Sequence, residues 1–309
     1  IIVVSVSIFS RYSLFVRNNL IKKWIKIKCF WGIMKDKIAI GIDFGGTKIK
    51  TAVISANGEI IGKPVVTPTE AQRPSQEIIQ SMVKTVSDAL QNAGVKITEI
   101  AGIGIGSPGP LDLDRGIILN TPNLPTLRNF PLKQKIEDHF NVPVLVNNDA
   151  NCFVLGEAFW GAGKGVNIVC GVTLGTGFGC GIVFGKKIFS GSTGTAAEVW
   201  NSPYQDLNFE EFGAARGVVK AYKELAGEKM SSLEIFNRAK SGDETAIKAW
   251  HEYGVHLGKI IAIMVNFLDP DVFVIGGSVS NAFTFFEKPM IQNAHKHINP
   301  IPRQHLSIL

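Results

Sequence analysis

The chain has 309 residues, of which 45% are hydrophobic and 19% charged, and this length suffices for two domains that each bury a core. The formal net charge of +6 originates in residues 1–35, which hold seven of the 32 basic residues and none of the 26 acidic ones. The rest of the chain has 25 basic and 26 acidic residues. A net charge so near zero argues against nucleic-acid binding as the main task of this part. We therefore predict no nucleic-acid partner.

Residues 1–33 differ from the rest of the chain. Their longest uncharged apolar run, Ile1–Ser10, has about half of the roughly 20 residues that a membrane-spanning helix needs. A signal peptide places its charges before the apolar stretch, whereas here they follow it. We interpret residues 1–33 as a non-native or disordered extension, which would be translated from sequence upstream of the gene's own start codon. Met34 is then the natural first residue. We predict no membrane partner. A membrane-surface anchor built on the Lys and aromatic side chains is the alternative.

The cysteines and histidines lack the spacing of a metal site. Four cysteines are present, at Cys29, Cys152, Cys170 and Cys180. They form no Cys-x-x-Cys pair and no regular framework, which is typical of reduced, mostly buried thiols in a cytoplasmic protein. None of the six histidines lies at ligand spacing to a cysteine, so we predict no structural zinc.

The first half of the chain predicts strands followed by alternating helices and strands. From residue 37, apolar strands joined by a Gly-rich turn extend to about Val66. Residues 74–92 carry apolar side chains at spacings of three and four, the pattern of an amphipathic helix. A strand at 100–105, a helix at 131–140 and a strand at 143–146 complete this half.

The second half predicts the same order of elements. It comprises a helix at 150–160, a Gly-rich hairpin at 167–189, helices at 209–226, 231–240 and 243–266, and a strand at 271–275. The final apolar run, Leu306–Leu309, is typical of the start of another strand, so we interpret the C-terminal domain as truncated. Alternating strands and helices with a hairpin opening each half predict an α/β protein of two related domains.

One Gly-rich hairpin occurs in both halves, as Asp43-Phe-Gly-Gly-Thr-Lys48 and as Leu174-Gly-Thr-Gly-Phe-Gly179. In each copy an apolar strand precedes small and hydroxyl residues, and a second apolar strand follows. Glycine lets backbone N–H groups approach a phosphate closely, while Thr and Lys add further donors. The pair indicates a duplicated fold with a nucleotide site; an ordinary structural β-turn is the alternative for each copy.

Together with Val274-Ile-Gly-Gly277, the two hairpins give the chain a family resemblance. From Met34 onward it resembles the ROK family of bacterial sugar kinases, relatives of hexokinase and actin; the hairpins look like that superfamily's phosphate motifs and the third segment like its adenosine motif. The resemblance implies a two-domain actin-like ATPase (ribonuclease H-like) fold, with duplicated βββαβα halves around an interdomain cleft. We accordingly expect an N-terminal domain at 34–147 and a C-terminal domain at 148–309.

On the ATP side, the resemblance implies contacts from the two hairpins and the adenosine motif. The residues are Asp43, Gly45, Gly46, Thr47, Lys48, Thr173, Gly175, Thr176, Gly177, Gly276 and Gly277. Asp43 is suited to hold Mg2+ through water, because hard cations prefer carboxylate oxygen and keep part of their hydration. Lys48 is either a phosphate-binding cation or a solvated hairpin residue. Phosphoryl transfer needs positioning and charge neutralisation more than covalent help from the protein.

Asn148 and Asp149 fall between a predicted strand and a predicted helix. In the resembling kinases this Asp is the general base that takes the proton of the sugar hydroxyl, and the Asn binds a neighbouring hydroxyl. A carboxylate that accepts the proton of an attacking alcohol typically contributes about 10²- to 10⁴-fold. We predict these roles for Asp149 and Asn148; a simple N-cap is the alternative for Asp149.

The remaining sugar-side candidates are Gly109, Asn123, Glu198 and Glu210. Gly109 and Asn123 match sugar-side segments of the family and equally suit ordinary turns. Glu198 aligns with the family's Gly-Glu-Ile-Gly-His segment, in which Trp200-Asn201 here replaces Gly-His, and Glu210 aligns with the end of its zinc motif. All cysteines of that motif are absent. Trp200 either stacks on a sugar face or fills the space of the missing metal loop.

The resemblance therefore implies an ATP-dependent hexose kinase that phosphorylates a 6-hydroxyl, most simply that of glucose, as a glucokinase does. N-acetylmannosamine kinase, fructokinase and allose kinase are the alternatives. A sugar-responsive regulator of the same family is a further alternative, although 36 residues before the first strand are too few for its helix-turn-helix domain. The implied partners are a sugar and ATP with Mg2+, in a cytoplasmic protein that forms a homo-oligomer, as a dimer.

Overall fold

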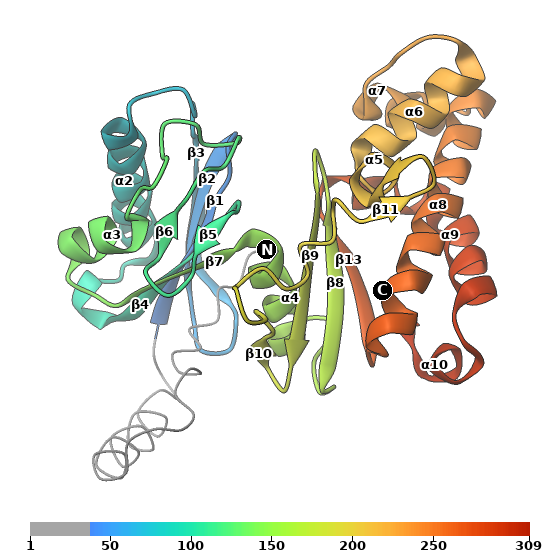
Figure 1. The fold of residues 1–309 in the computed structure, drawn as a ribbon. Coiled ribbons are helices and arrows are strands. Elements are labelled where there is room, and N and C mark those ends of the chain that lie inside the picture. Colours follow the sequence, from blue (N-terminus) through green and yellow to red (C-terminus); the bar gives the residue numbers. More distant parts are fainter. Residues whose placement is uncertain (1–37) are drawn as a thin grey trace. The chain divides into compact units, whose positions relative to one another are not determined.

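The computed structural model describes residues 38–309, so the interpretation of residues 1–33 and of Met34 lies outside the described part of the chain. The chain divides into two compact units, the first ending at Cys152 and the second running Phe153–Leu309 (Figure 1). The division falls inside helix α4 (Asp149–Trp160). Each unit is described by itself below.

The first unit is built on a five-stranded sheet in the order β3-β2-β1-β4-β7. Its strands are β1 (Ile38–Phe44), β2 (Lys48–Ile54), β3 (Ile60–Pro68), β4 (Ile100–Ser107) and β7 (Val144–Asn148). The first three strands pair antiparallel, whereas β1, β4 and β7 pair parallel. The parallel strands bring the carboxyl ends of β1 and β7, and hence Asp43 and Asn148, to the same edge of the sheet.

Helices α2 (Ser75–Ala93) and α3 (Leu132–Phe140) lie on the same side of this sheet (Figure 1). Ile40 and Ile42 of β1 are fully buried, as are Ile78 and Met82 of α2, and all four belong to one apolar cluster. The short elements of the unit are η2 (Ile97–Glu99), β5 (Leu111–Asp112) and β6 (Ile117–Ile118). The amphipathic pattern of residues 74–92 is thus confirmed as a helix whose apolar face covers the sheet.

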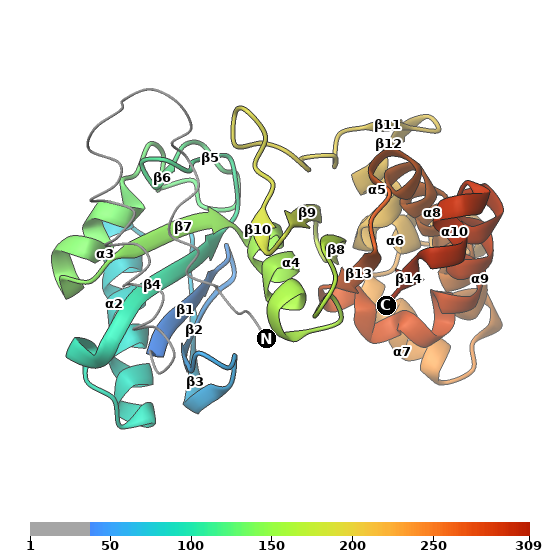
Figure 2. The same cartoon turned by 90° about the horizontal axis from the view of Figure 1, so that it is seen from below.

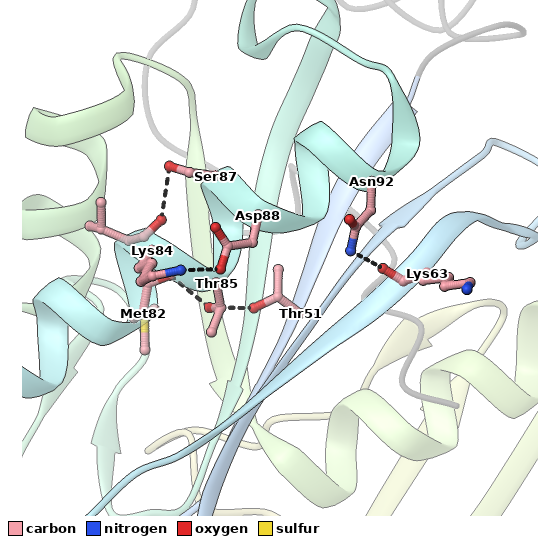
Figure 3. Close-up of polar contacts among 9 residues, drawn as sticks. Thr51, Lys63, Met82, Lys84, Thr85, Ser87, Asp88 and Asn92 are labelled. Carbon is pink, nitrogen blue, oxygen red and sulfur yellow. Dashed lines mark hydrogen bonds and ion pairs between the residues drawn. The ribbon is translucent and has the colours of Figure 1, made fainter.

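A buried pair of hydroxyls joins α2 to β2. Thr51 and Thr85 are both fully buried, and their Oγ1 atoms lie 2.8 Å apart (Figure 3). The Thr85 hydroxyl also donates to the carbonyl of Met82 at 2.7 Å. Because a hydroxyl has one proton to give, Thr51 is the donor within the pair.

We expect Thr85→Val to lower the free energy of unfolding by about 1–3 kcal/mol, because it leaves the buried Thr51 donor without its acceptor. Thr51→Val costs less, about 1 kcal/mol or below, because Thr85 keeps its bond to Met82. The double variant should recover most of the loss, since both polar groups are then gone. Urea unfolding of the three variants measures this; equal losses for both single variants would contradict the assigned donor.

The second unit repeats the first sheet strand for strand. Its order is β10-β9-β8-β13-β14, with antiparallel pairing among β8, β9 and β10 and parallel pairing of β13 with β8 and β14. The strands are β8 (Ile168–Leu174), β9 (Phe178–Phe184), β10 (Lys187–Ile188), β13 (Val272–Gly276) and β14 (Ser307–Ile308). The predicted duplication is therefore confirmed, and the apolar run Leu306–Leu309 supplies the predicted strand.

Helices cover both faces of the second sheet. Helix α4 packs on one face, in a cluster with Val169 and Val274, while the large cluster around Trp250 lies on the other (Figure 1). The helices on that side are α5 (Phe209–Gly213), α6 (Ala215–Ala226), α7 (Ser232–Lys240), α8 (Glu244–Leu268), η3 (Ser278–Ala282), α9 (Phe283–His297) and α10 (Pro300–His305). Helices α8 and α9 lie side by side in both views (Figure 2), and a Cβ on Gly258 would stand 2.2 Å from the carbonyl oxygen of Met290.

One predicted helix, at 209–226, is wrong as a single element. It breaks at Ala214, whose ψ of −178° is extended, into α5 and α6. The backbone groups at the break have tertiary partners: the N–H of Ala215 donates to the carbonyl of Gly175 at 2.9 Å, and the hydroxyl of Tyr253 donates to that of Gly213 at 2.6 Å. Within residues 38–309, no helix combines the length and the apolar character needed to cross a membrane.

Candidate functional site

The first Gly-rich turn, between β1 and β2, is held by a threonine that sequence reasoning missed. Gly45 donates its N–H to the carbonyl of Lys48 at 3.0 Å. Thr69, which is fully buried, donates its hydroxyl to the carbonyl of Gly45 at 2.6 Å and its N–H to that of Thr47 at 2.9 Å. The sequence offers little indication of this role, since Thr69 stands only as the residue after the end of β3.

Two predicted sugar-side residues lie near this turn within the first unit. A Cβ on Gly46 would stand 2.6 Å from the carbonyl oxygen of Asn123, so the Asn123 segment packs directly on the turn. Gly109 lies in the connection from β4 to β5, and β4 is the parallel neighbour of β1. Asn123 is thus brought against the predicted phosphate hairpin, whereas Gly109 follows the adjacent strand.

At the junction of β7 and α4, the helix is capped by Asn148. Its Oδ1 accepts from the N–H of Ala150 at 2.9 Å and of Asn151 at 3.4 Å, the positions that an N-cap side chain serves. Asn147, another residue missed from sequence, accepts from the Asn151 amide at 3.1 Å and braces the same turn. Asn148, and not Asp149, is therefore the N-cap of α4.

The carboxylate of Asp149 is close enough to Asp43 for its charge to act on the Asp43 carboxyl. Burial raises the pKa of Asp149. The N–H of Ala150, which donates to Asp149 Oδ1 at 2.8 Å, lowers this pKa but does not cancel the effect of burial. Burial also raises the pKa of Asp43, and the charge of Asp149 raises it further, while Lys48 and Lys50 act in the opposite direction. A bound cation would stabilise the ionised forms of two such neighbouring carboxyls.

The donor set at this pair fits a hydrated divalent ion. Both groups are hard oxygen donors, the type that Mg2+ takes while it keeps several of its waters. Because burial and like charge disfavour the ionised pair, a cation here would lower the pKa of both carboxyls. Lys48 is exposed at the start of β2, and its charge reaches Asp43.

In the second unit, the second hairpin and the adenosine motif lie together. Thr173 of β8 pairs with Gly276 of β13. Gly277 has a φ of +90°, and a Cβ on it would stand 2.3 Å from the carbonyl oxygen of Leu174, so only glycine fits this close approach. A Cβ on Gly175 would meet nothing nearer than Ser278 Oγ, at 3.6 Å.

Thr176 and Gly177 complete the turn of that hairpin. Thr176 is exposed, and the carbonyl of Gly177 accepts from the N–H of Gly175 at 3.1 Å. The six predicted ATP-side residues of this unit are therefore gathered at the ends of β8 and β13. Ser278 directly follows the adenosine motif, and its Oγ lies 3.6 Å from the point where a Cβ on Gly175 would stand.

The segment with Glu198 carries backbone strain. Ala197 has a φ of +68°, in the left-handed region that favours glycine, and the resemblance has glycine at this position. The pKa of the Cys180 thiol on β9 is raised, first by a hydrogen bond with Cys170 and by burial, and also by the charge of Glu198. The Glu198 carboxylate is therefore near β9, the strand that follows the second hairpin.

The segment that replaces the family's zinc loop forms a small hairpin, β11 (Pro203–Tyr204) and β12 (Leu207–Asn208). Aromatic packing anchors it: the rings of Tyr204 and Phe212 are 5.1 Å apart, and the Tyr204 hydroxyl lies 3.1 Å from His256 Nδ1. Burial lowers the pKa of His256, which favours the neutral form of that imidazole. Trp200, in contrast, is 40% exposed, which disfavours the space-filling role.

In the part of the chain that the structure covers, no three His, Cys, Asp or Glu side chains gather as a metal site. We expect the purified protein to hold less than one zinc per chain, and 1,10-phenanthroline to leave its turnover unchanged in excess Mg2+, because packing around Tyr204 fixes the loop. Metal analysis by mass spectrometry and the treated assay measure this. Stoichiometric zinc, or loss of activity restored by added zinc, would contradict it.

Comparisons with known proteins assign the chain to a family. The model described as ROK family matches residues 39–308. A glucokinase of Halalkalibacterium halodurans is 31% identical over 86% of this chain and 88% of its own. An N-acetyl-D-glucosamine kinase of Pasteurella multocida is 32% identical over 80% and 86%. A ROK family glucokinase from Streptomyces griseus, solved with glucose and AMPPNP, is 28% identical, with a TM-score of 0.75 over 88% of this chain and 93% of that one.

These structural matches agree with the duplicated sheets, so the two-domain actin-like ATPase fold implied by the resemblance is confirmed. The family match covers both hairpins, the Asn148-Asp149 junction and the adenosine motif. The chain belongs to the ROK family.

Proposed function

We propose that this chain is an ATP-dependent hexose kinase that transfers the γ-phosphoryl group of ATP to the 6-hydroxyl of a sugar, with glucose as the first substrate to test. The glucokinase of Halalkalibacterium halodurans and the N-acetyl-D-glucosamine kinase of Pasteurella multocida align with 86% and 80% of this chain. A relative solved with glucose and AMPPNP supports a sugar and a nucleotide as the two substrates.

The observation that carries the proposal is the pairing of Asp149 with Asp43 beside the first Gly-rich turn. The two carboxylates are near enough for the charge of one to raise the pKa of the other. Asn148 caps α4, so Asp149 is not needed for that structural task. A buried carboxylate with a raised pKa and no capping role is typical of a general base.

In the proposed reaction, Asp149 accepts the proton of the sugar hydroxyl as that oxygen attacks phosphorus. Asp43 holds Mg2+ through water; when bound, the ion neutralises phosphate oxygens. The two Gly-rich turns bind phosphate through backbone N–H groups. We assign sugar contacts to five further residues: Gly109, Asn123, Asn148, Glu198 and Glu210.

Four sugars besides glucose are alternative substrates. They are N-acetylmannosamine, fructose and allose, together with N-acetylglucosamine, which the name of the Pasteurella multocida relative gives as its substrate. The β11–β12 hairpin and the exposed Trp200 stand where the family's zinc loop is expected, next to Glu198 in sequence. This local difference is a reason to test each sugar directly.

The proposal is tested by measuring ADP release with Mg2+-ATP over a panel of hexoses and N-acetylhexosamines. We expect one of them, glucose first, to stimulate release well above the rate without sugar, with one sugar phosphate formed per ADP. Chromatography of the product identifies the phosphorylated carbon. No stimulation by any sugar of the panel would remove the proposed function.

We expect the kcat/KM for the sugar to fall in acid with a pKa above 3.8, the ordinary value of an aspartic acid, because burial raises the pKa of Asp149. The base must be ionised, so activity is present above this raised pKa and is lost as the pH decreases through it. A pH profile at a low, fixed Mg2+ concentration, at which much of the enzyme is free of the ion, measures this pKa, with circular dichroism as the control for folding. Saturating Mg2+ should move the loss of activity to lower pH, because a bound cation lowers the pKa of both carboxyls. An apparent pKa at or below 3.8 at the low Mg2+ concentration would contradict a desolvated base.

A further inference from the structure

The segment from Trp200 to Glu210, which we call the clasp, closes on itself through two backbone hydrogen bonds. The N–H of Glu210 donates to the carbonyl of Trp200, and the N–H of Phe209 donates to that of Ser202, both at 3.0 Å. The paired strands β11 and β12 lie between these bonds. The start of α5, where Glu210 stands, is therefore tied to the residues that follow Glu198 in sequence.

Both sugar-side acids of this unit border the clasp. Glu198 stands two positions before its first residue, and Glu210 is its last. The Oε2 of Glu210 accepts from the N–H of Phe178, which follows the second Gly-rich turn, at 3.1 Å, and its Oε1 lies 3.3 Å from Arg216 Nη2. Since a carboxylate has about four acceptor positions, these contacts leave room for a sugar hydroxyl.

One tyrosine of the clasp anchors it to α8. Tyr204, in β11, is buried, and its hydroxyl lies 3.1 Å from Nδ1 of His256 on α8. Its ring meets three others edge to face, those of His256, Phe209 and Phe212, at centroid distances of 5.8, 6.1 and 5.1 Å. Edge-to-face pairs at such distances attract one another beyond the effect of the area that they bury.

A charged contact between α6 and the clasp is weaker than this anchor. Lys220 Nζ lies 3.7 Å from Oδ1 of Asp206, in the turn of the hairpin, but Asp206 is largely exposed. Water and salt screen such a pair, so its contribution is small. The support behind Tyr204 is firm by comparison, because α8 buries Trp250 and Tyr253 in the main core of the unit.

We infer that Tyr204 and His256 are positioning residues for the sugar, which anchor the clasp to α8 and so set the geometry of Glu198 and Glu210. The inference rests on the proposed kinase function, in which both acids contact the sugar. The second Gly-rich turn has a support of its own, the 2.9 Å bond from the N–H of Ala215 to the carbonyl at its start. The anchor therefore affects the sugar more than the nucleotide.

The test removes the hydroxyl alone in Tyr204→Phe and the ring contacts as well in Tyr204→Ala. We expect the KM for the sugar to rise about threefold in Tyr204→Phe and at least about tenfold in Tyr204→Ala, because the second change also removes the edge-to-face packing. The KM for ATP should change less than about twofold in Tyr204→Phe. Steady-state kinetics and calorimetric binding of the sugar measure the two effects.

Tyr222→Phe is a matched control in the same unit. Tyr222 on α6 is also buried, and its hydroxyl accepts from Arg238 Nη1 at 2.8 Å, a bond that joins α6 to α7. Its loss should leave both KM values within about twofold, whatever it does to the Tm. An equal rise in the KM for the sugar would mean that general destabilisation is the cause, and it would overturn the inference.

Hydrogen exchange followed by mass spectrometry measures the clasp directly. Peptides that contain the N–H groups of Phe209 and Glu210 should exchange faster in Tyr204→Phe than in the wild type, because the two bonds that close the clasp open more often. The same peptides should be unchanged in Tyr222→Phe. Wild-type exchange of these peptides in Tyr204→Phe would contradict the anchoring role.

A double-variant cycle tests the hydrogen bond itself. His256→Phe keeps a ring and removes the Nδ1 partner, so it breaks the same bond as Tyr204→Phe. The two effects on the KM for the sugar should therefore not multiply in the double variant. Multiplying effects would overturn the inference, and this cycle decides the question if Tyr204→Ala does not fold.

The two proposals fail in different ways. If the wild-type protein binds a sugar but releases no ADP with it, the kinase function fails and the sugar-binding comparison still decides the role of Tyr204 and His256. If the wild-type protein is an active kinase and the Tyr204 variants keep its KM for the sugar, only the inference is overturned. If the wild-type protein binds no sugar, both are overturned.

Discussion

Asp149→Asn is expected to lower kcat by about 10²- to 10⁴-fold while nucleotide binding stays intact, because the amide cannot accept the proton of the sugar hydroxyl. The change is nearly isosteric, and Asn148 still caps α4, so the helix start is preserved. Steady-state kinetics with the preferred sugar, together with binding of an ATP analogue, measure the two effects. Near-normal turnover would remove Asp149 from its proposed role.

The same change is expected to make the fold more stable at neutral pH. Since burial raises the folded-state pKa of Asp149, the folded protein binds more protons than the unfolded chain between pH 3.8 and that raised value. Stability therefore falls as the pH rises through this window, and the charged carboxylate destabilises the fold above it. Asp149→Asn removes that cost, so its Tm without Mg2+ or nucleotide should exceed the wild-type Tm at neutral pH and approach it in acid.

A matched control excludes a general effect of removing one acid. Asp88 lies on α2, where its carboxylate pairs with Lys84 on the surface. Asp88→Asn should leave kcat unchanged and should not raise the Tm, because an exposed pair contributes at most about 1 kcal/mol. An equal gain in Tm for both variants would contradict burial as the cause.

Gly175→Ala is the second variant with a large expected effect, a rise of at least about tenfold in the KM for ATP with the fold unchanged. The added methyl group would meet nothing nearer than Ser278 Oγ at 3.6 Å, so the protein accommodates it. It would, however, occupy the side of the turn from which a phosphate approaches the backbone in the proposed function. Nucleotide binding and thermal melting separate the two effects.

Gly277→Ala gives the contrast, because its methyl group would overlap the carbonyl oxygen of Leu174 at 2.3 Å and φ is +90°. This variant should lose about 2–5 kcal/mol of unfolding free energy. Unchanged nucleotide affinity in a folded Gly175→Ala protein would mean that the second hairpin is an ordinary structural turn.

Much of the site was predictable because its signals are local. Glycines and hydroxyls between two apolar strands defined both hairpins, and both are present between β1 and β2 and between β8 and β9. Likewise, the placement of Asn148 and Asp149 between a strand and a helix is confirmed. The spacing of apolar residues, every two residues in a strand or every 3.6 in a helix, is set by residues close together in the sequence. It therefore predicts the element wherever the tertiary structure buries the apolar face.

Other features depended on residues far apart in the chain. Thr69 holds the first turn across 24 positions, and Glu210 binds Phe178 across 32. The helix predicted at 209–226 is broken because Ala215 and Gly213 find partners outside it. No local pattern specifies such contacts, since each depends on how strands and helices pack.

The sequence by itself determined the duplicated α/β fold, the two Gly-rich turns and the acid that follows β7, because strand and helix periodicity and the backbone freedom of glycine act locally. Only the tertiary structure decided which neighbour caps α4, what fills the place of the zinc loop and which turn Glu210 touches. The physical reason is that hydrogen bonds and packing between distant residues form only after the sheets have assembled, and burial then sets which carboxylates resist ionisation.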